Sequence, residues 1–177
     1  MIKLTTERLL IRDYIVSDLE DLHSLISDKK NMYLVDDIFS NSIEETSENL
    51  ENAMKNEDGH YFAICDIRNG EFIGSVGYTY TTYTLDCKVA HLGYFILPQH
   101  HGKGYTTEAV KKVLEFAFKS GGCTRITTGC YSEHIASIRV MEKAGFRRES
   151  EHLNAAWHDG VLKDRLEYAI DVEGYLA

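Results

Sequence analysis

The apolar positions along this chain follow two periodicities, and each predicts one kind of secondary structure. Alternating or continuous runs of apolar and β-branched residues predict strands over residues 8–12, 61–67, 71–81, 88–97, 125–130, 146–156 and 164–172. Apolar residues three and four positions apart predict helices over residues 17–26, 42–55, 106–119 and 135–143. This order of elements predicts an α+β fold, with a mixed, mostly antiparallel central sheet and helices on both of its faces.

Short polar motifs mark the expected ends of these elements. The segments 17–20 and 42–45 each place a serine three residues before a glutamate, which is the capping-box pattern of a helix start. The dipeptide at 69–70 is Asn-Gly, which predicts a tight hairpin between two strands. Since no linker, repeat or low-complexity segment divides the chain, residues 1–177 are predicted to form a single domain.

Composition narrows the class of protein. The chain has 177 residues, 44% of them hydrophobic, which suits one domain with a buried core. It contains no run of about 20 apolar residues and no signal-peptide core at its start, so we expect a cytoplasmic protein without a membrane segment. The formal net charge of −9 argues against nonspecific nucleic-acid binding. That charge is compatible with a cationic acceptor, although solubility alone also explains it.

The four cysteines form no recognisable motif. Cys65, Cys87, Cys123 and Cys130 contain no C-x-x-C pair and no zinc-binding spacing. Two of them, Cys65 and Cys130, fall in predicted strands, where a cysteine usually serves as a small buried apolar residue. We therefore expect reduced thiols and no metal site, and a cysteine nucleophile is disfavoured.

A glycine-bearing turn predicts an anion site. Residues 99–108 read QHHGKGYTTE and follow the apolar run 92–98 directly. Gly102 and Gly104 leave room for a close approach to the backbone, and a helix that begins near Thr106 directs its free N–H groups back at the turn. The ligand is therefore expected to carry a phosphate or pyrophosphate. The turn matches neither the P-loop of nucleotide triphosphatases nor the dinucleotide-binding pattern.

Two linked motifs identify the turn further. The spacing Gln99-x-x-Gly102-x-Gly104 resembles the acetyl-CoA pyrophosphate loop of the GNAT N-acetyltransferase superfamily. About 30 residues downstream, segment 132–146 is similar to the N-x-x-S…E-K-x-G-F region of the same superfamily. The opening segment 5–12 resembles the start of the RimJ/RimL-type subgroup, which acetylates protein N-termini and small amines. The resemblance covers nearly the whole chain and implies the GNAT fold and an acetyl-CoA-dependent N-acetyltransferase.

The resemblance implies a set of donor-binding residues. The pantetheine arm is expected along the backbone of Phe95, Ile96 and Leu97, where an open strand edge can pair with its amides. Residues around the pyrophosphate are expected to be His101, Gly102, Lys103, Gly104, Tyr105 and Thr106. His134 and Ser137 are expected beside the thioester end of the same ligand. No metal is implied.

Ser137 and His134 are the catalytic candidates in the second motif. Ser137 stands at the serine position, from which a hydroxyl is proposed to hydrogen-bond the leaving sulfur; local bonding to the helix backbone is the alternative. Many superfamily members use a tyrosine one turn further on, where this chain has Met141. His134 replaces the usual asparagine, and either acid–base chemistry or helix capping would explain it.

His91 is a candidate general base. It stands in A-H-L-G-Y, where many relatives have a glutamate that faces the acceptor. An imidazole there could accept the ammonium proton, or it could simply be exposed on the sheet. On the preceding strand, Tyr78 and Tyr80 could line the acceptor site or be structural. Trp157 could border the acceptor site or pack at the sheet edge, whereas a structural role is expected for Glu108 at the helix start.

Three functions from different classes fit these motifs to different degrees. The leading hypothesis is acetyl transfer from acetyl-CoA to a primary amine by direct attack in a ternary complex. A catalytically silent acyl-CoA-binding module is the second, and a nucleotide-dependent phosphotransferase is the third. A protein N-terminus, a polyamine, an amino acid or an aminoglycoside would each suit as acceptor. The oligomeric state stays open, although dimers are common among relatives.

Overall fold

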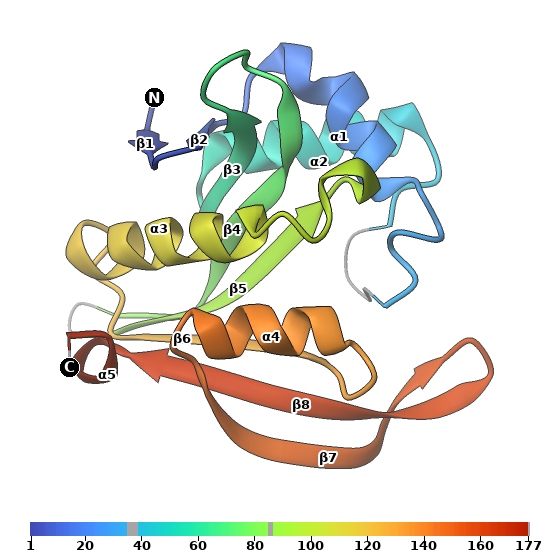
Figure 1. The fold of residues 1–177 in the computed structure, drawn as a ribbon, viewed down its shortest axis with the longest axis vertical. Coiled ribbons are helices and arrows are strands. Elements are labelled where there is room, and N and C mark those ends of the chain that lie inside the picture. Colours follow the sequence, from blue (N-terminus) through green and yellow to red (C-terminus); the bar gives the residue numbers. More distant parts are fainter. Residues whose placement is uncertain (35–38, 85–86, 177) are drawn as a thin grey trace.

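In the computed structural model, which describes residues 1–34, 39–84 and 87–176, one sheet organises the chain (Figure 1). The described strands lie side by side in the order β1-β2-β3-β4-β5-β6-β8-β7. Their bounds are β1 Lys3–Thr5, β2 Leu9–Asp13, β3 Gly59–Asp66, β4 Phe72–Tyr83, β5 Lys88–Ile96, β6 Arg125–Tyr131, β7 Arg147–His158 and β8 Val161–Asp171. Neighbouring strands run antiparallel except β5 and β6, which are parallel.

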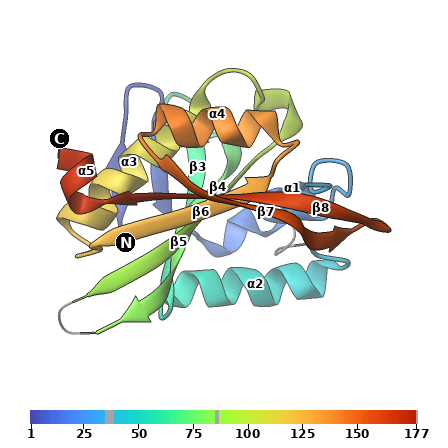
Figure 2. The ribbon, with the colours of Figure 1, turned by 90° about the horizontal axis from the view of Figure 1, so that it is seen from below.

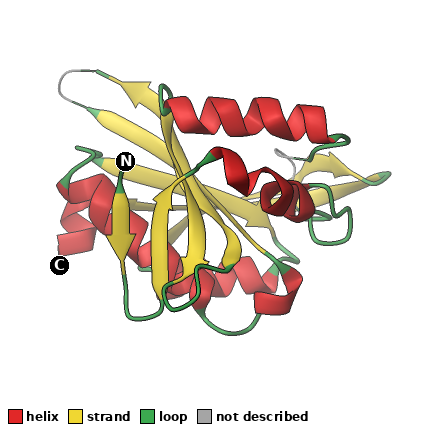
Figure 3. Cartoon of the chain, turned by 90° about the horizontal axis from the view of Figure 1, so that it is seen from above, coloured by secondary structure: helices red, strands yellow, loops and turns green. Residues whose placement is uncertain are grey.

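Helices cover both faces of the sheet, as Figures 2 and 3 show. The α-helices are α1 Leu19–Ile26, α2 Ile43–Lys55, α3 Tyr105–Lys119, α4 Ile135–Lys143 and the short α5 Val172–Leu176, and two 3₁₀ turns span η1 Val16–Asp18 and η2 Pro98–His100. The helices α1 and α2 lie on one face, and α3 and α4 lie on the other. The predicted α+β fold, with a mixed, mostly antiparallel sheet, is confirmed.

Each face carries its own apolar core. One cluster packs β2 to β6 and β8 against α3 and α4, with Val110, Leu114 and Met141 among its fully buried members. The other packs the opposite face against α1 and α2 through residues such as Leu25 and Leu50. Most of β3 and the first seven residues of β4 are buried, whereas β5 mixes buried and half-buried residues.

Two helix starts differ in how their caps form. At α2 the predicted cap is present, because the Ser42 hydroxyl accepts a hydrogen bond from the Glu45 N–H at 3.2 Å. At α1 the capping box predicted over 17–20 is wrong, because the helix begins at Leu19 and Ser17 lies in the preceding 3₁₀ turn. The Asp18 carboxylate makes the local contacts instead. It accepts a hydrogen bond from the Ile15 N–H at 2.9 Å and forms an ion pair with Arg12 at 2.7 Å.

Strands β5 and β6 separate after a short parallel ladder. They pair only from Val89 to His91 on β5 and from Arg125 to Thr127 on β6. A final side-chain bond runs from the Thr128 hydroxyl to the Leu92 carbonyl at 3.0 Å. Beyond it, β5 remains on β4 and β6 remains on β8. The sheet therefore opens between the carboxyl ends of β5 and β6, and the predicted site residues lie around this opening.

Candidate active site

The backbone of β5 offers alternate peptide groups to the opening. The Leu97 N–H donates to the Ile73 carbonyl on the β4 side at 3.0 Å. Because antiparallel bonding alternates, Phe95 and Leu97 direct their peptide groups at β4, while Tyr94 and Ile96 direct theirs at the opening. The Ile96 carbonyl already accepts from the His101 ring Nε2 at 2.9 Å and the Asn31 amide at 3.3 Å.

This geometry distinguishes among the three residues that were predicted to contact the pantetheine arm. Of the three predicted residues, only Ile96 has its peptide group at the open edge. Phe95 instead contributes its side chain to the neighbouring cavities. Leu97 is 8% exposed and belongs to the core beneath α1 and α2. The peptide group of Tyr94, a residue that no donor-binding motif marks, faces the open edge where that of Leu97 was expected.

The glycine turn and the start of α3 line a cavity of about 390 Å³, called here the loop cavity. Gly102 and Gly104 adopt left-handed backbone conformations, with φ of 73° and 80°, and Gly104 is the N-cap residue of α3. The predicted donor-binding residues that line this cavity are Phe95, Ile96, His101, Gly102, Gly104, Thr106, His134 and Ser137. The start of a helix directs free N–H groups at this space, as an anion site requires.

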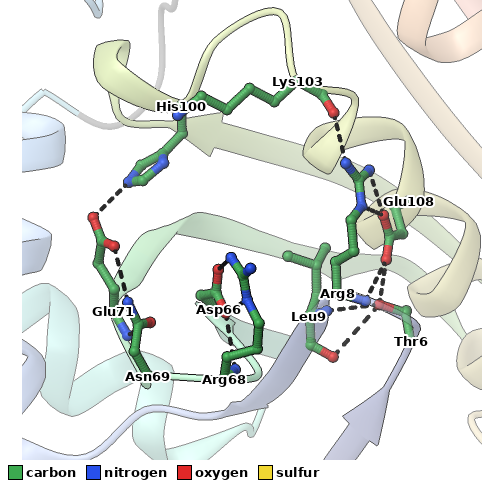
Figure 4. Close-up of polar contacts among 10 residues, drawn as sticks. All are labelled: Thr6, Arg8, Leu9, Asp66, Arg68, Asn69, Glu71, His100, Lys103 and Glu108. Atoms are coloured by element: carbon green, nitrogen blue, oxygen red, sulfur yellow. Dashed lines mark hydrogen bonds and ion pairs between the residues drawn. The ribbon is translucent and has the colours of Figure 1, made fainter.

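Lys103 and Tyr105, also predicted at the pyrophosphate, both contact Arg8, and Figure 4 shows the contact made by Lys103. The Lys103 carbonyl accepts from the Arg8 guanidinium at 3.0 Å, and its side chain is exposed. The Tyr105 ring lies beneath the same guanidinium at 4.6 Å. Neither residue lines the loop cavity, so both support the turn from behind.

Glu108 has the structural role expected of it. Its carboxylate accepts from the Thr6 hydroxyl at 2.5 Å and from the Arg8 side chain at 2.7 Å (Figure 4). Burial raises the pKa of Glu108, but the hydrogen bonds from Thr6 and Arg8 outweigh burial and hold the pKa below its ordinary value. Thr6 and Arg8 of the opening segment therefore fix the first turn of α3.

A second contact holds the beginning of the same turn. The buried His100 ring lies with its Nε2 3.2 Å from the Glu71 carboxylate, which belongs to the hairpin between β3 and β4 (Figure 4). The Glu71 N–H in turn donates to the Asn69 side chain at 3.0 Å. The glycine turn is thus bonded to the segment before β2 through Arg8, and His100 at its beginning lies beside the β3–β4 hairpin.

Ser137 lies in the first turn of α4 and is 7% exposed. Its hydroxyl lies 2.7 Å from the Tyr94 phenol oxygen, which is also 3.3 Å from the Ser137 carbonyl. Both residues line the loop cavity and a second cavity of about 350 Å³, called here the central cavity. Burial raises the pKa of the Tyr94 phenol far above its ordinary value, although the bond to Ser137 opposes the rise. The phenol therefore remains protonated at neutral pH.

His134 immediately precedes α4 and makes no capping hydrogen bond, so helix capping does not explain it. Its side chain lines both the loop cavity and the central cavity. Burial lowers the pKa of His134, and a positive charge on His101 lowers it further. A neutral imidazole here can donate one hydrogen bond and accept another, so acid–base chemistry stays a prediction for this residue.

His91 lies on the α1–α2 face of the sheet and lines the central cavity. Its Nδ1 is 3.2 Å from the Thr127 hydroxyl, and it pairs in register with Thr79 on β4. Tyr78 on that strand is completely buried against the opposite core, so it does not border an acceptor. The β4 side chains that line the central cavity with His91 are small, namely Ser75 and Thr79.

A third cavity of about 690 Å³ lies between α2 and the sheet and is called here the α2 cavity. Its lining includes four carboxylate side chains: Glu45, Glu48, Glu57 and Asp58. Lys55 is its one cation among the described residues. The α2 cavity and the central cavity share Tyr61, Ser75, Thr79 and Phe95, and the central and loop cavities share Tyr94, Phe95, His134 and Ser137. The three cavities therefore adjoin one another in a series from the glycine turn to α2.

Other sequence features lie away from these cavities. Trp157 is 71% exposed and lines none of the three. No three described His, Cys, Asp or Glu side chains are grouped closely enough to hold a metal ion. Across residues 1–34, 39–84 and 87–176, no helix combines the length and apolarity needed to cross a membrane.

The chain is similar to solved structures of acetyltransferases. A GNAT-family acetyltransferase from Bacillus anthracis superposes with a TM-score of 0.84 and 28% identity, covering 97% of this chain and 99% of that one. The spermidine N-acetyltransferase from Vibrio cholerae, solved with CoA and spermine, has a TM-score of 0.87 at 21% identity, over 97% of this chain and 100% of that one.

The sequence comparisons then give the family. Residues 8–147 match the family model described as "Acetyltransferase (GNAT) domain", and the chain belongs to this family of acetyltransferases. The "Uncharacterized N-acetyltransferase YnaD" of Bacillus subtilis (strain 168) is 31% identical over 147 residues, which cover 82% of this chain and 83% of YnaD. The superfamily predicted from the two linked motifs is confirmed.

Proposed function

We propose that this chain is a single-domain, cytoplasmic enzyme that transfers the acetyl group of acetyl-CoA to a primary amine in a ternary complex. The observation that carries the proposal is that the three cavities adjoin one another through shared lining residues, with Ser137, Tyr94 and His134 lining both the loop and the central cavity. A donor that binds at the glycine turn and an acceptor that binds beneath α2 would meet at these residues. Direct attack requires such a meeting point.

The residues of the loop cavity suit the chemistry of CoA. Backbone N–H groups after Gly104 would hold the pyrophosphate at the α3 N-terminus. The open edge at Tyr94 and Ile96 would pair with the amides of the pantetheine arm. The thioester would then lie beside Ser137, whose hydroxyl is available to the sulfur.

The chemical step needs a neutral amine and a stabilised leaving group. An alkylamine has a pKa of about 10, so a base must take its proton, and His91 and His134 are the imidazoles that line the central cavity. The amine nitrogen forms the new bond to the acetyl carbon, and the carbon–sulfur bond breaks with its electron pair on sulfur. Ser137 would hydrogen-bond that sulfur as charge develops.

The α2 cavity favours a cationic small-molecule amine over a neutral acceptor. Four carboxylates against one lysine give its described lining a negative charge, which attracts ammonium groups and raises their local concentration. Aromatic rings of Tyr14, Tyr61 and Phe95 also line it and can contact a cation or an alkyl chain. The Vibrio cholerae relative with the same fold was solved with spermine, which supports this acceptor class. A protein N-terminus remains the alternative acceptor.

Thiol release from acetyl-CoA by the purified protein tests the proposal. The panel would contain spermidine, a neutral amino acid and a peptide with a free N-terminus, each with a control that lacks acceptor. Turnover that depends on one acceptor, with its acetylated product identified by mass spectrometry, is the expected result. Binding of CoA without turnover on any acceptor would instead favour the silent acyl-CoA-binding module, and failure to bind CoA would overturn both.

A further inference from the structure

Tyr94 and Ser137 form a hydroxyl pair, of which the mechanism proposed above uses only the serine. Tyr94 comes from β5 and Ser137 from the first turn of α4, so the pair spans the opening of the sheet. Their oxygens are 2.7 Å apart, within the range of a good O–H···O hydrogen bond. Both side chains lie at the junction of the loop and central cavities, where the thioester is proposed to lie.

Two arrangements of the hydroxyl protons fit these distances. A phenol buried this deeply keeps its proton, because burial raises the pKa of Tyr94. Its single proton can go to the Ser137 Oγ at 2.7 Å or to the Ser137 carbonyl at 3.3 Å, and either hydroxyl can be the donor of the shorter contact. In the arrangement in which the phenol donates to Oγ, the serine O–H is left to donate into the cavity.

A free serine hydroxyl has three rotamers, and in the first turn of a helix some of them bond back to the backbone. The contact with Tyr94 favours the arrangement in which the Ser137 oxygen faces β5 and the cavities. When the phenol donates to Oγ, the Ser137 O–H then points into the cavity. This orientation is what hydrogen bonding to a departing sulfur would require.

We propose that Tyr94 is a positioning residue that fixes the Ser137 hydroxyl for hydrogen bonding to the leaving thiolate, an inference that rests on the acetyltransferase function proposed above. Superfamily members with a tyrosine one turn after this serine place a phenol on the helix itself. Here that position is Met141, completely buried in the core. The phenol reaches the site from β5 instead and acts through the serine.

The step is balanced without any proton leaving Tyr94. The carbon–sulfur bond breaks as the carbon–nitrogen bond forms, and the electron pair remains on sulfur. The ammonium nitrogen loses one proton to the base before attack and a second once the new bond has formed; the thiolate gains one proton and the other is released to solvent. Ser137 supplies a hydrogen bond during this process, and Tyr94 keeps its own proton throughout.

The test compares Tyr94→Phe, Ser137→Ala and the double variant in steady-state kinetics with acetyl-CoA and the acceptor found for the wild type. Tyr94→Phe is expected to lower kcat roughly tenfold, about the worth of one hydrogen bond, with KM for acetyl-CoA within about twofold. Ser137→Ala is expected to lower kcat at least as much. Because the two act as one unit, the double variant should match Ser137→Ala alone.

The matched control is Tyr78→Phe, which removes a phenol hydroxyl that is buried on β4 and faces none of the three cavities. It should leave kcat and KM unchanged. Equal kcat for wild type and Tyr94→Phe, or losses that multiply in the double variant, would overturn the positioning role while leaving the acetyltransferase function intact. A wild type that never turns over would overturn the function and this inference together.

A second measurement separates positioning from a folding defect. Titration of each variant with CoA should give the wild-type affinity, since the pair does not hold the pyrophosphate. If Tyr94→Phe fails to bind CoA, 3-fluorotyrosine at position 94 of the full chain replaces it, because it keeps the shape and alters the acidity of the phenol. A change in kcat at constant KM supports the inference, and identical kinetics overturn it.

Discussion

The guanidinium of Arg8 and the carboxylate of Glu108 lie 2.6 Å apart, although one hundred residues separate them in the chain. The pair connects the segment before β2 to the first turn of α3, and a second Arg8 bond reaches the Lys103 carbonyl in the glycine turn. Arg8 therefore fixes the conformation of the turn without lining the loop cavity. A turn held in advance loses less conformational entropy when a phosphate binds.

Arg8→Ala is accordingly expected to raise KM for acetyl-CoA roughly tenfold, as loss of hydrogen bonds to a charged group does, with little change in kcat. Arg8→Lys should recover part of the loss, since a lysine keeps the charge but not the forked geometry. The matched control is Arg68→Ala, which removes an exposed arginine paired with Asp66 on the hairpin that also holds the turn (Figure 4). Equal effects of Arg8→Ala and Arg68→Ala on KM would contradict this role.

The acidic lining of the α2 cavity predicts a change in acceptor affinity alone. Replacing Glu45 and Glu48 by glutamine should raise KM for a cationic amine, by about two- to fivefold for each exposed carboxylate–ammonium pair that is lost. The loss should shrink at high salt, because ions screen the attraction. KM for acetyl-CoA should not change, since neither residue lines the loop cavity. Glu44→Gln on the same helix, outside the cavity lining, is the control. A salt-independent effect, or an equal effect of the control, would argue against electrostatic recognition.

His91 is the imidazole on the acceptor side of the opening. Its substitution is therefore predicted to lower the rate of acetyl transfer. Because His91 is proposed as the general base, His91→Ala should lower kcat by about 10²-fold or more. His91→Gln keeps a polar side chain beside Thr127 without a group that titrates, and it should be equally impaired. CoA binding measured by titration should be unaffected in both. A His91→Gln enzyme with wild-type kcat would remove His91 from the mechanism.

His134 predicts a particular dependence of stability on pH. Burial and His101 lower its pKa in the folded protein below the ordinary histidine value of 6.5. The unfolded chain therefore binds the proton more readily, and stability falls as pH drops through about 6.5 toward the folded pKa. His134→Asn should lose less stability over this interval than the wild type. Thermal unfolding at pH 5, 6, 7 and 8 measures this difference, and parallel curves for the two proteins would contradict the prediction.

The fold could be predicted because its strands and helices carry strong local patterns, and the exceptions are short. The strand β1 has three residues and two of them are exposed, so no apolar alternation marks it. The glycine turn was predictable from Gly102 and Gly104, since positive φ and a helix start leave a local signature. The start of α1 was placed wrongly because Asp18, rather than Ser17, makes the local hydrogen bonds.

The site was harder to predict, because long-range contacts determine it. Leu97 and Ile96 differ by one position, and only the pairing of β5 with β4 decides which peptide group faces the opening. Tyr94 has the sequence pattern of an ordinary strand residue, and its meeting with Ser137 depends on how α4 packs over the opening. The α2 cavity likewise combines residues from Tyr14 to Phe95 that no local motif connects.

Two glycines with the same backbone conformation provide the last prediction. Gly102 in the turn and Gly70 in the β3–β4 hairpin have φ of 73° and 75°, and an added Cβ would have no heavy-atom neighbour within 4 Å at either position. Alanine at either site is therefore expected to destabilise the protein by about 1–2 kcal/mol through backbone strain, measured by denaturant unfolding. Only Gly102→Ala should also raise KM for acetyl-CoA, because only Gly102 lines the loop cavity and its relaxed backbone would move N–H groups away from the phosphate. Equal stability losses with no difference in KM would show that the turn does not bind the donor.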